Sequence, residues 1–295
     1  MTGQTLSRLT LIALELVAIT GCRDEQKIKA DSDVLVRTPL ENLVTVKGGS
    51  FQMGNFSPLM TENAENRPYD FDKDAPLHPV TLSDFRIGKY RVTWGEFNRW
   101  LVIQGRDKNT IYQTISQGKY FSKQDKEALG ETYPAMASWQ EVRDYCQWLG
   151  KNSHRNMDLP TEAQWEYAAR NRGQFIIYAN SDNKWHDHSD KLRNFADDFR
   201  TDNLFKKPVG SYSPTPLGLY DMMGNGADWI KDWYAADYFL HSSKIDPQGP
   251  ENGTKKVIRG ENRNEDSSYT ITRGGWDPDN EWLSGIRCVE NSPLK

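Results

Sequence analysis

The stretch Ser213-Pro-Thr-Pro-Leu-Gly-Leu-Tyr-Asp-Met-Met-Gly-Asn-Gly-Ala-Asp-Trp-Ile-Lys-Asp-Trp233 is the most informative part of this 295-residue chain. It is so dense in Gly, Asn, Asp and Trp that it predicts neither one long helix nor one plain strand. The pattern indicates a tightly turned loop, anchored by aromatic rings, that brings several oxygen atoms close together.

The composition narrows the class of protein that contains this loop. Hydrophobic residues make up 37% of the chain and the mean hydropathy is −0.78, which excludes a polytopic membrane protein. The net charge of −4 does not suggest a nucleic-acid-binding surface, so we expect no nucleic-acid partner. Aromatic residues reach 12%, which favours a core built on large rings over one built on aliphatic layers.

Residues 1–21 have the character of a secretory signal peptide. Arg8 precedes an apolar run over residues 9–20, which is too short to span a bilayer. The run ends at Ile19-Thr20-Gly21-Cys22, which resembles a bacterial lipobox, and the resemblance implies that Cys22 becomes a lipidated first residue. An ordinary secretory signal with a chance cysteine is the alternative. Because Arg23 follows, the resemblance implies an anchor on the periplasmic face of the outer membrane.

Residues 22–42 comprise this cysteine and a polar, charged segment. The segment lacks the apolar side chains that a core needs, so we expect a flexible tether. Such a tether would hold the globular part, residues 43–292, away from the membrane surface.

Two cysteines, Cys146 and Cys288, lie within the globular part. In a secreted protein they could form one disulfide, which would close a long loop. Cys146 also lies on what reads as the buried face of a helix, and it could instead stay a free thiol that packs there as a small apolar side chain. The sequence leaves both alternatives open.

Three helix starts are predicted by capping boxes at Thr93, Ser138 and Thr161, each followed three residues later by Glu or Gln. Short strands are expected at residues 43–47, 49–53, 80–85, 86–90 and 257–259. Long stretches elsewhere show no sustained period, so we expect many ordered loops and low regular secondary structure. No internal repeat is visible, which indicates a single domain.

Several motifs follow one another in a fixed order along the globular part. The main ones are Val46-Lys-Gly-Gly-Ser-Phe-Gln-Met-Gly54, Phe85-Arg-Ile-Gly-Lys-Tyr-Arg-Val-Thr93, Leu159-Pro-Thr-Glu-Ala-Gln-Trp-Glu-Tyr-Ala-Ala-Arg170, Gly218-Leu-Tyr-Asp-Met-Met-Gly-Asn225 and Gly285-Ile-Arg-Cys288. Together they resemble the sulfatase-modifying-factor domain, the fold of formylglycine-generating enzymes. The resemblance covers residues 43–292 and implies a single α+β domain related to C-type lectin-like folds.

The enzymes of this family use two nearby cysteines to bind copper and activate oxygen, and soft thiolates suit Cu(I). The matching stretch here, residues 263–273, contains no cysteine, and Cys288 lies outside the catalytic position. We therefore expect no copper and assign no catalytic residue. We also expect no iron, since the pair His186 and His188 lacks a third ligand at a readable spacing. Glu162, Glu166 and Arg170, on one predicted helix, indicate a structural ion network.

The resemblance also implies Ca²⁺, which the family binds with oxygen ligands in irregular loops. Asn225 and Asp228 match the family's Gly-Asn-x-x-Glu-Trp ligands, with Asp in place of Glu. Asn194 and Asp198 fall where another loop site is expected. The alternative is that Asn225 and Asp228 only bind loop backbone.

Two functional hypotheses follow. The first is a non-catalytic, membrane-tethered binding protein whose partner is a periplasmic or secreted protein. Such a protein could be the cognate inhibitor (immunity protein) of a toxin, or an accessory subunit of an envelope complex. The second is a metal-dependent oxidoreductase of the same superfamily with other chemistry.

The candidate partner-binding residues lie near the groove that takes the substrate peptide in the enzymes. Tryptophan is favoured at the energetic centres of interfaces. The alternative is that both tryptophans pack inside the domain. The candidates are Trp276, Asp277, Asp279, Glu281 and Trp282.

Overall fold

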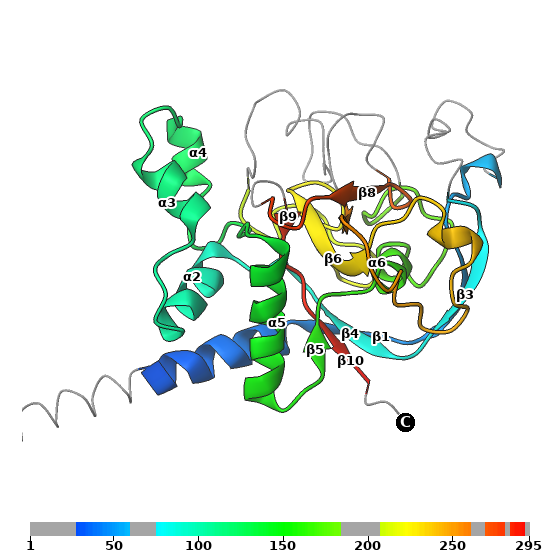
Figure 1. Ribbon diagram of the computed structural model, residues 1–295, viewed down its shortest axis with the longest axis horizontal. Coiled ribbons are helices and arrows are strands. Elements are labelled where there is room, and N and C mark those ends of the chain that lie inside the picture. The colour runs from blue at the N-terminus through cyan, green and yellow to red at the C-terminus, as the bar shows by residue number, and fades with distance from the viewer. Residues whose placement is uncertain (1–27, 60–74, 184–206, 261–268, 281–283, 293–295) are drawn as a thin grey trace, which may run out of the picture.

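The computed structural model describes residues 28–59, 75–183, 207–260, 269–280 and 284–292. Helices and short strands mix in one domain, which confirms the α+β fold (Figure 1). The helical elements are residues 28–41, η1 (Ser57–Leu59), α2 (Trp94–Ile103), α3 (Thr110–Gln117), α4 (Lys123–Glu127), α5 (Trp139–Ser153), α6 (Glu162–Ala169) and η3 (Tyr238–Leu240). The strands are β1 (Leu43–Val46), β2 (Gly49–Met53), β3 (His78–Leu82), β4 (Phe85–Gly88), β5 (Met157–Asp158), β6 (Ala227–Trp233), β7 (Lys256–Arg259), β8 (Arg273–Trp276), β9 (Ser284–Gly285) and β10 (Val289–Asn291).

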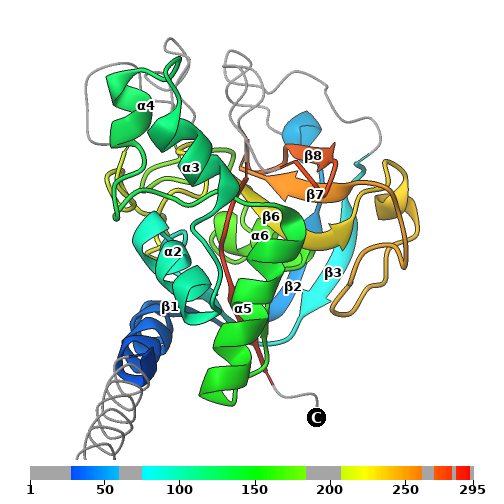
Figure 2. The ribbon, with the colours of Figure 1, turned by 60° about the vertical axis from the view of Figure 1, so that its left-hand side comes forward.

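The described strands form sheets with the orders β1-β4-β10-β5, β2-β3 and β8-β7-β6-β9. In the first sheet β4 pairs antiparallel with both β1 and β10, so strands from the two ends of the domain share one sheet. In the third sheet β6 pairs antiparallel with β7 and parallel with β9. Helices α2, α3 and α4 lie on one side of α5, and strands β6 to β8 lie on the other (Figures 1 and 2).

Strand β6 corrects the prediction of one turned loop over residues 213–233. Residues 227–233 form a seven-residue strand. Successive side chains of a strand point to opposite faces, and here both faces are buried, because Trp229 belongs to one hydrophobic cluster and Ile230 to the other. A strand that is buried on both faces lacks the apolar–polar alternation by which strands are identified in a sequence.

The tight turn lies just before β6, so that part of the prediction is confirmed. Asp221, Gly224, Asn225 and Gly226 have positive φ angles of 56°, 74°, 53° and 110°. Glycine adopts such angles at little cost, and Asn and Asp tolerate them better than other side chains. The Gly-Asn-Gly sequence therefore reverses the chain and leads it into the core.

Helices α2, α5 and α6 begin where the capping boxes predict. The hydroxyls of Thr93, Ser138 and Thr161 each accept a hydrogen bond from the backbone N–H three residues later. The box is reciprocal in α2 and α6. In α5 the carboxylate of Glu141 instead forms an ion pair with Arg106, so a tertiary contact replaces the second half of the box.

The N-terminal helix, residues 28–41, corrects the prediction of a flexible tether for this part of residues 22–42, while residues 22–27 lie outside the described residues. Leu35 is 1% exposed and lies in the hydrophobic cluster that contains α2 and α5. Arg86 Nη2 donates to the carbonyl of Leu40 at 3.3 Å, and Lys89 N donates to the carbonyl of Asn42 at 2.8 Å. Leu35, with Val36 and Leu40 packed against the same cluster, thus docks a helix that reads as polar overall. No described helix is long and apolar enough to cross a membrane.

Cys146 of α5 and Cys288 are joined by a disulfide, with their Cα atoms 5.5 Å apart. This observation decides between the two alternatives that the sequence leaves open. Both residues are buried, and the bond spans a sequence separation of 142 residues. It ties α5 to the segment that leads into β10.

Removal of this disulfide should destabilise the domain. For the double variant Cys146→Ala/Cys288→Ala we expect the free energy of unfolding to fall by roughly 2–5 kcal/mol, because the unfolded chain regains the entropy of a long loop. In a domain of this size that loss lowers Tm by about 5–15 °C. Thermal unfolding with and without a reducing agent measures it. The reductant should lower Tm of the wild type and leave the double variant unchanged, and equal Tm values throughout would contradict the expectation.

Candidate functional site

Strand β6 carries Asp228 into the interior, between two arginines. Its Oδ1 accepts from Arg91 Nε at 2.7 Å, and its Oδ2 accepts from Arg287 Nε at 3.1 Å and Trp165 Nε1 at 2.8 Å. The side chains of Asp228 and both arginines have no exposed surface. Burial by itself raises the pKa of Asp228, but the charges of Arg287 and Arg91 outweigh it and hold that pKa below its ordinary value. Asp228 is therefore an ionised carboxylate.

Other donors of the two arginines hold the backbone of the turn. Arg91 Nη1 donates to the carbonyls of Gly224 and Asn225, both at 2.8 Å. Arg287 Nη2 donates to the carbonyl of Tyr220 at 2.9 Å. One carboxylate and two guanidinium groups thus join the turn, β6, the residues before α2 and the C-terminal segment.

This geometry contradicts the assignment of Asn225 and Asp228 as calcium ligands. Each oxygen of Asp228 accepts from a guanidinium group, so positive charge occupies the place that Ca²⁺ would need. Asn225 exchanges hydrogen bonds with the backbone of Lys207, at 3.4 Å through Oδ1 and 3.2 Å through Nδ2. The backbone role, which the sequence allows as the alternative, is therefore observed for Asn225. Asn194 and Asp198 lie outside the described residues.

Helix α6 carries a second ionic cluster, in which Arg259 bridges Glu162 and Glu166 at 2.8 and 2.9 Å. Arg273 binds both oxygens of Glu162 at 2.8 Å, and Arg170 binds Glu166 at 2.6 Å. These side chains are at most 2% exposed. The like-charge pair on α6 is thus compensated by cations from other elements, and the structural ion network is confirmed. Among the described residues no group of three His, Cys, Asp or Glu side chains is placed to hold a metal.

Asp232, further along β6, is a buried acid that titrates near neutral pH. Burial, with a smaller contribution from the charge of Glu162, raises the pKa of Asp232 to about 8. Its Oδ1 accepts no hydrogen bond from any described residue, and the side chain is buried. The neutral form is therefore favoured in the folded protein.

Lys256 of β7 is a buried base with the opposite shift. Its ammonium lies 3.8 Å from the ring centroid of Trp139 and 3.6 Å from that of Trp233, and it donates to the carbonyl of Lys231 at 3.0 Å. Burial, with a smaller contribution from the charge of Arg143, lowers the pKa of Lys256 to about 8. The aromatic pair is thus filled by the chain's own cation, so it is closed to a ligand cation.

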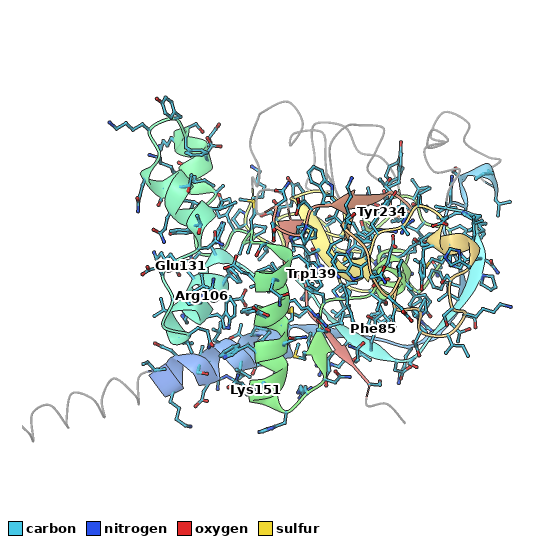
Figure 3. The ribbon with its side chains drawn as sticks, viewed as in Figure 1. Phe85, Arg106, Glu131, Trp139, Lys151 and Tyr234 are labelled. Atoms are coloured by element: carbon cyan, nitrogen blue, oxygen red, sulfur yellow. A yellow bond between two sulfur atoms is a disulfide. The ribbon has the colours of Figure 1, made fainter. Side chains whose placement is uncertain are left out.

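The turn after β8 holds the described part of the predicted partner-binding surface. Asp277 and Asp279 are exposed, and Trp276 is half-buried against the cluster of α2 and α5. Asp279 N donates to Asp277 Oδ1 at 3.0 Å, and Trp139 N donates to the carbonyl of Pro278 at 2.9 Å, which fixes the turn on the start of α5. Figure 3 shows Trp139 at that end of α5 and Lys151 at the other. The other two predicted members, Glu281 and Trp282, lie outside the described residues.

A hollow of about 480 Å³, which no sequence motif indicates, lies between the N-terminal helix, the β4–α2 connection and residues 208–209. Its walls are mostly apolar. Glu96 lies on it, with Oε2 accepting from N and Oγ1 of Thr93 at 2.8 and 3.0 Å, and burial raises the pKa of Glu96. The hollow suits a small apolar molecule that donates a hydrogen bond. One of its walls is the segment that the sequence predicts to be a tether, which explains why no motif indicated it.

Comparison with known proteins identifies the family. Residues 30–292 match the sulfatase-modifying factor enzyme 1-like domain, and because the match covers most of the chain, the chain belongs to this family. The match begins inside the N-terminal helix, which agrees with the docking of that helix on the domain.

The relatives carry different names. The formylglycine-generating enzyme of Streptomyces coelicolor is 27% identical, over 85% of this chain and 90% of its own length. The chaperone protein LppX of Paenibacillus barcinonensis is 28% identical, over 97% of this chain and 92% of its own length. The serine/threonine-protein kinase pkn1 of Chlamydia pneumoniae is 28% identical over 84% of this chain, but the match spans only 40% of that kinase.

Solved structures with the same fold include PvdO from Pseudomonas aeruginosa. Its TM-score is 0.62 at 24% identity, over 85% of this chain and 94% of PvdO. CarF has a TM-score of 0.55 at 20% identity, over 85% of this chain and 98% of CarF. At these identities the likeness shows the fold alone.

Replacement of Asp228 tests its role as the anion between two buried cations. We expect Asp228→Asn to lower the free energy of unfolding by roughly 3–5 kcal/mol, because Arg91 and Arg287 are left as uncompensated buried charges. Urea unfolding followed by tryptophan fluorescence measures the change. Asp279→Asn, on an exposed turn, is the control and should change stability by less than about 0.5 kcal/mol. A loss that appears only when Ca²⁺ is present would contradict the ion-pair role.

The raised pKa of Asp232 predicts a pH-dependent stability. Because its folded-state pKa of about 8 lies above the ordinary 3.8, the folded protein keeps a proton that the unfolded chain loses as pH rises. The free energy of unfolding of the wild type therefore falls as pH rises from about 4 to about 8, with a slope of at most about 1.4 kcal/mol per pH unit from this group. Asp232→Asn removes this dependence, so the unfolding free energy of the variant relative to wild type should rise over that range.

Urea unfolding at several pH values measures the difference between Asp232→Asn and wild type. Asp237→Asn, at an exposed position in the same segment, is the control and should show no comparable trend. A difference for Asp232→Asn that stays constant across the range would mean that Asp232 is ionised in the folded protein.

Proposed function

We propose that this member of the sulfatase-modifying factor family is a non-catalytic binding protein, held by a lipid on Cys22 at the periplasmic face of the outer membrane. The observation that carries the proposal is the disulfide between Cys146 and Cys288. The third cysteine of the chain, Cys22, precedes the matched domain. The domain therefore retains no pair of thiolates of the kind that binds copper in formylglycine-generating enzymes.

The disulfide also supports the proposed compartment. Disulfides persist in oxidising environments such as the bacterial periplasm and are rare in the cytosol. The lipid anchor itself rests on the lipobox-like sequence that ends at Cys22, which lies outside the described residues.

The turn after β8 is the proposed docking surface. Its backbone is held by α5 and by Asp277, so a partner would meet a preorganised shape and lose little entropy in ordering it. The exposed carboxylates of Asp277 and Asp279 would favour a basic patch on the partner. Trp276, with part of its ring still exposed, would supply the apolar contact.

A periplasmic or secreted protein is the proposed partner, either a toxin that this protein inhibits as an immunity protein or a component of an envelope complex. The relative named a chaperone supports a binding function, since it matches over nearly the full length of both chains. The relatives named formylglycine-generating enzymes favour the second candidate, a metal-dependent oxidoreductase with other chemistry. Calcium bound through Asn194 and Asp198 stays a proposal.

Affinity capture separates the two candidates. The domain from Arg23 onward, without lipid, serves as bait for periplasmic extract and for the products of neighbouring genes, and its metal content is measured in the same sample. One stoichiometric partner without copper or iron supports the binding function. Stoichiometric copper or iron with no partner would overturn it in favour of an oxidoreductase.

Once a partner is identified, Asp279→Lys should raise its Kd on the order of tenfold, which corresponds to about 1.4 kcal/mol of binding free energy. The reason is that the variant places a cation opposite the basic patch expected on the partner. The control is Asp107→Lys, since Asp107 is also exposed but lies between α2 and α3. Isothermal titration calorimetry gives both values of Kd, and equal weakening by the two variants would contradict the assignment of the surface.

A further inference from the structure

We propose that the folded domain rests against the bilayer with its N-terminal helix toward the phospholipid headgroups and the turn Trp276–Asp279 facing away. The inference rests on the proposed lipid at Cys22, and it adds the orientation that such an anchor imposes on this fold. The flexible tether predicted from the sequence would impose no orientation.

The N-terminal helix is a fixed part of the domain. Leu35 is buried in the core, and the carbonyls of Leu40 and Asn42 accept hydrogen bonds from Arg86 and Lys89. Asp33 of the helix and Asn152 of α5 line one shared hollow, which places the helix beside the C-terminal end of α5. Residue 28 is therefore an attachment point at a set place on the surface.

The short length of chain before this point limits where the domain can lie. Six residue steps separate Cys22 from Ile28, and a fully extended chain covers about 3.6 Å per step, so the reach is about 20 Å. Had residues 22–42 been flexible, as the sequence predicts, the reach would have been about 70 Å. Docking of the helix removes more than two thirds of that reach.

The reach of this chain is short compared with the distances across the domain, and this limits how the domain can face the bilayer. A compact domain of this length is about 45 Å across. In Figures 1 and 2, helix 28–41 lies at the lower side of the molecule and β8 lies toward the upper side. The turn after β8 contacts the start of α5 and the N-terminal helix lies beside its end, so the 15 residues of α5, about 22 Å of helix, separate the two. If the β8 side touched lipid, the attachment point would stand beyond the roughly 20 Å that the extended chain can reach. The turn after β8 therefore faces the compartment, where a soluble partner can reach it.

The surface proposed to face the bilayer carries both positively and negatively charged side chains. Arg37 and Lys151 are exposed there, but so is Glu41, and Lys29 lies 3.6 Å from Asp33. Such a surface suits the mixed charges of a headgroup layer without strong attraction to anionic lipid. The orientation is set by the length of the anchor and not by charge.

Fluorescence on vesicles tests the orientation with the full-length, lipidated protein. Lys151→Cys and Asp279→Cys place a thiol near each end of α5, while Cys146 and Cys288 stay closed and Cys22 is blocked by lipid. Each variant is labelled with a maleimide donor and reconstituted into phosphatidylethanolamine–phosphatidylglycerol vesicles that carry a headgroup-linked acceptor. Energy transfer should be several-fold stronger from position 151 than from position 279. Equal or reversed transfer would overturn the proposal.

An insertion provides the matched control. A flexible Gly-Ser linker of about twenty residues between Lys27 and Ile28 keeps the helix docked but restores the long reach. The difference between positions 151 and 279 should then shrink, whereas the same linker added after Lys295 should leave it intact. A difference that survives the first insertion would mean that direct lipid contacts, and not the anchor, orient the domain.

Mass spectrometry of the peptide containing Cys22 distinguishes a failure of the lipid anchor from a failure of the orientation. An unmodified Cys22 would remove the anchor of the proposed function, and the orientation with it. An acylated Cys22 together with equal energy transfer would overturn the orientation alone. Partner capture by the lipid-free domain is independent of either result.

Discussion

The buried carboxylate of Asp228, held between Arg91 and Arg287, is the interaction on which the rest of the structure depends. Each of the three charged groups would be very costly to bury alone, so each requires the other two. Through this cluster, three distant parts of the chain become one unit: the residues before α2, the turn before β6, and the segment before β10. The turn before β6 and Asp228, which belong to the motif that identifies the family, therefore stabilise the fold of this chain.

Other interior contacts stabilise the rest of the fold. The two ionic clusters and the disulfide join distant parts of the core, and Cys146 and Cys288 are both used in the disulfide. A fold that is held by contacts in its interior can keep its structure while its surface changes. The binding that we propose for the turn after β8 would use only that surface. The N-terminal helix, packed beside the other end of α5, gives the domain a defined point of attachment to the residues before it.

Much of the architecture could be predicted, because some signals are local. The hydroxyls at Thr93, Ser138 and Thr161 mark helix starts through bonds to residues three positions away, so a short window contains the whole signal. The short strands β1, β2 and β7 could also be predicted, because the signal for each lies within its own few residues. The role of Asp228 was not readable, since its partners Arg91 and Arg287 lie 137 and 59 residues away. A carboxylate in a Gly-rich turn has the same local sequence whether it binds Ca²⁺ or arginine.

The sequence by itself determined the family, the α+β class, the tight turn before β6, the helix starts and the lack of cysteine in residues 263–273, because each is carried by residue types at short spacing. Only the tertiary structure decided that residues 227–233 form a strand, that Cys146 reaches Cys288, and that residues 28–41 dock as a helix. These outcomes depend on what lies across the core: both faces of β6 are covered by distant clusters, and Leu35 finds a buried site. Burial by partners that are remote in sequence leaves no local pattern, so packing alone settles it.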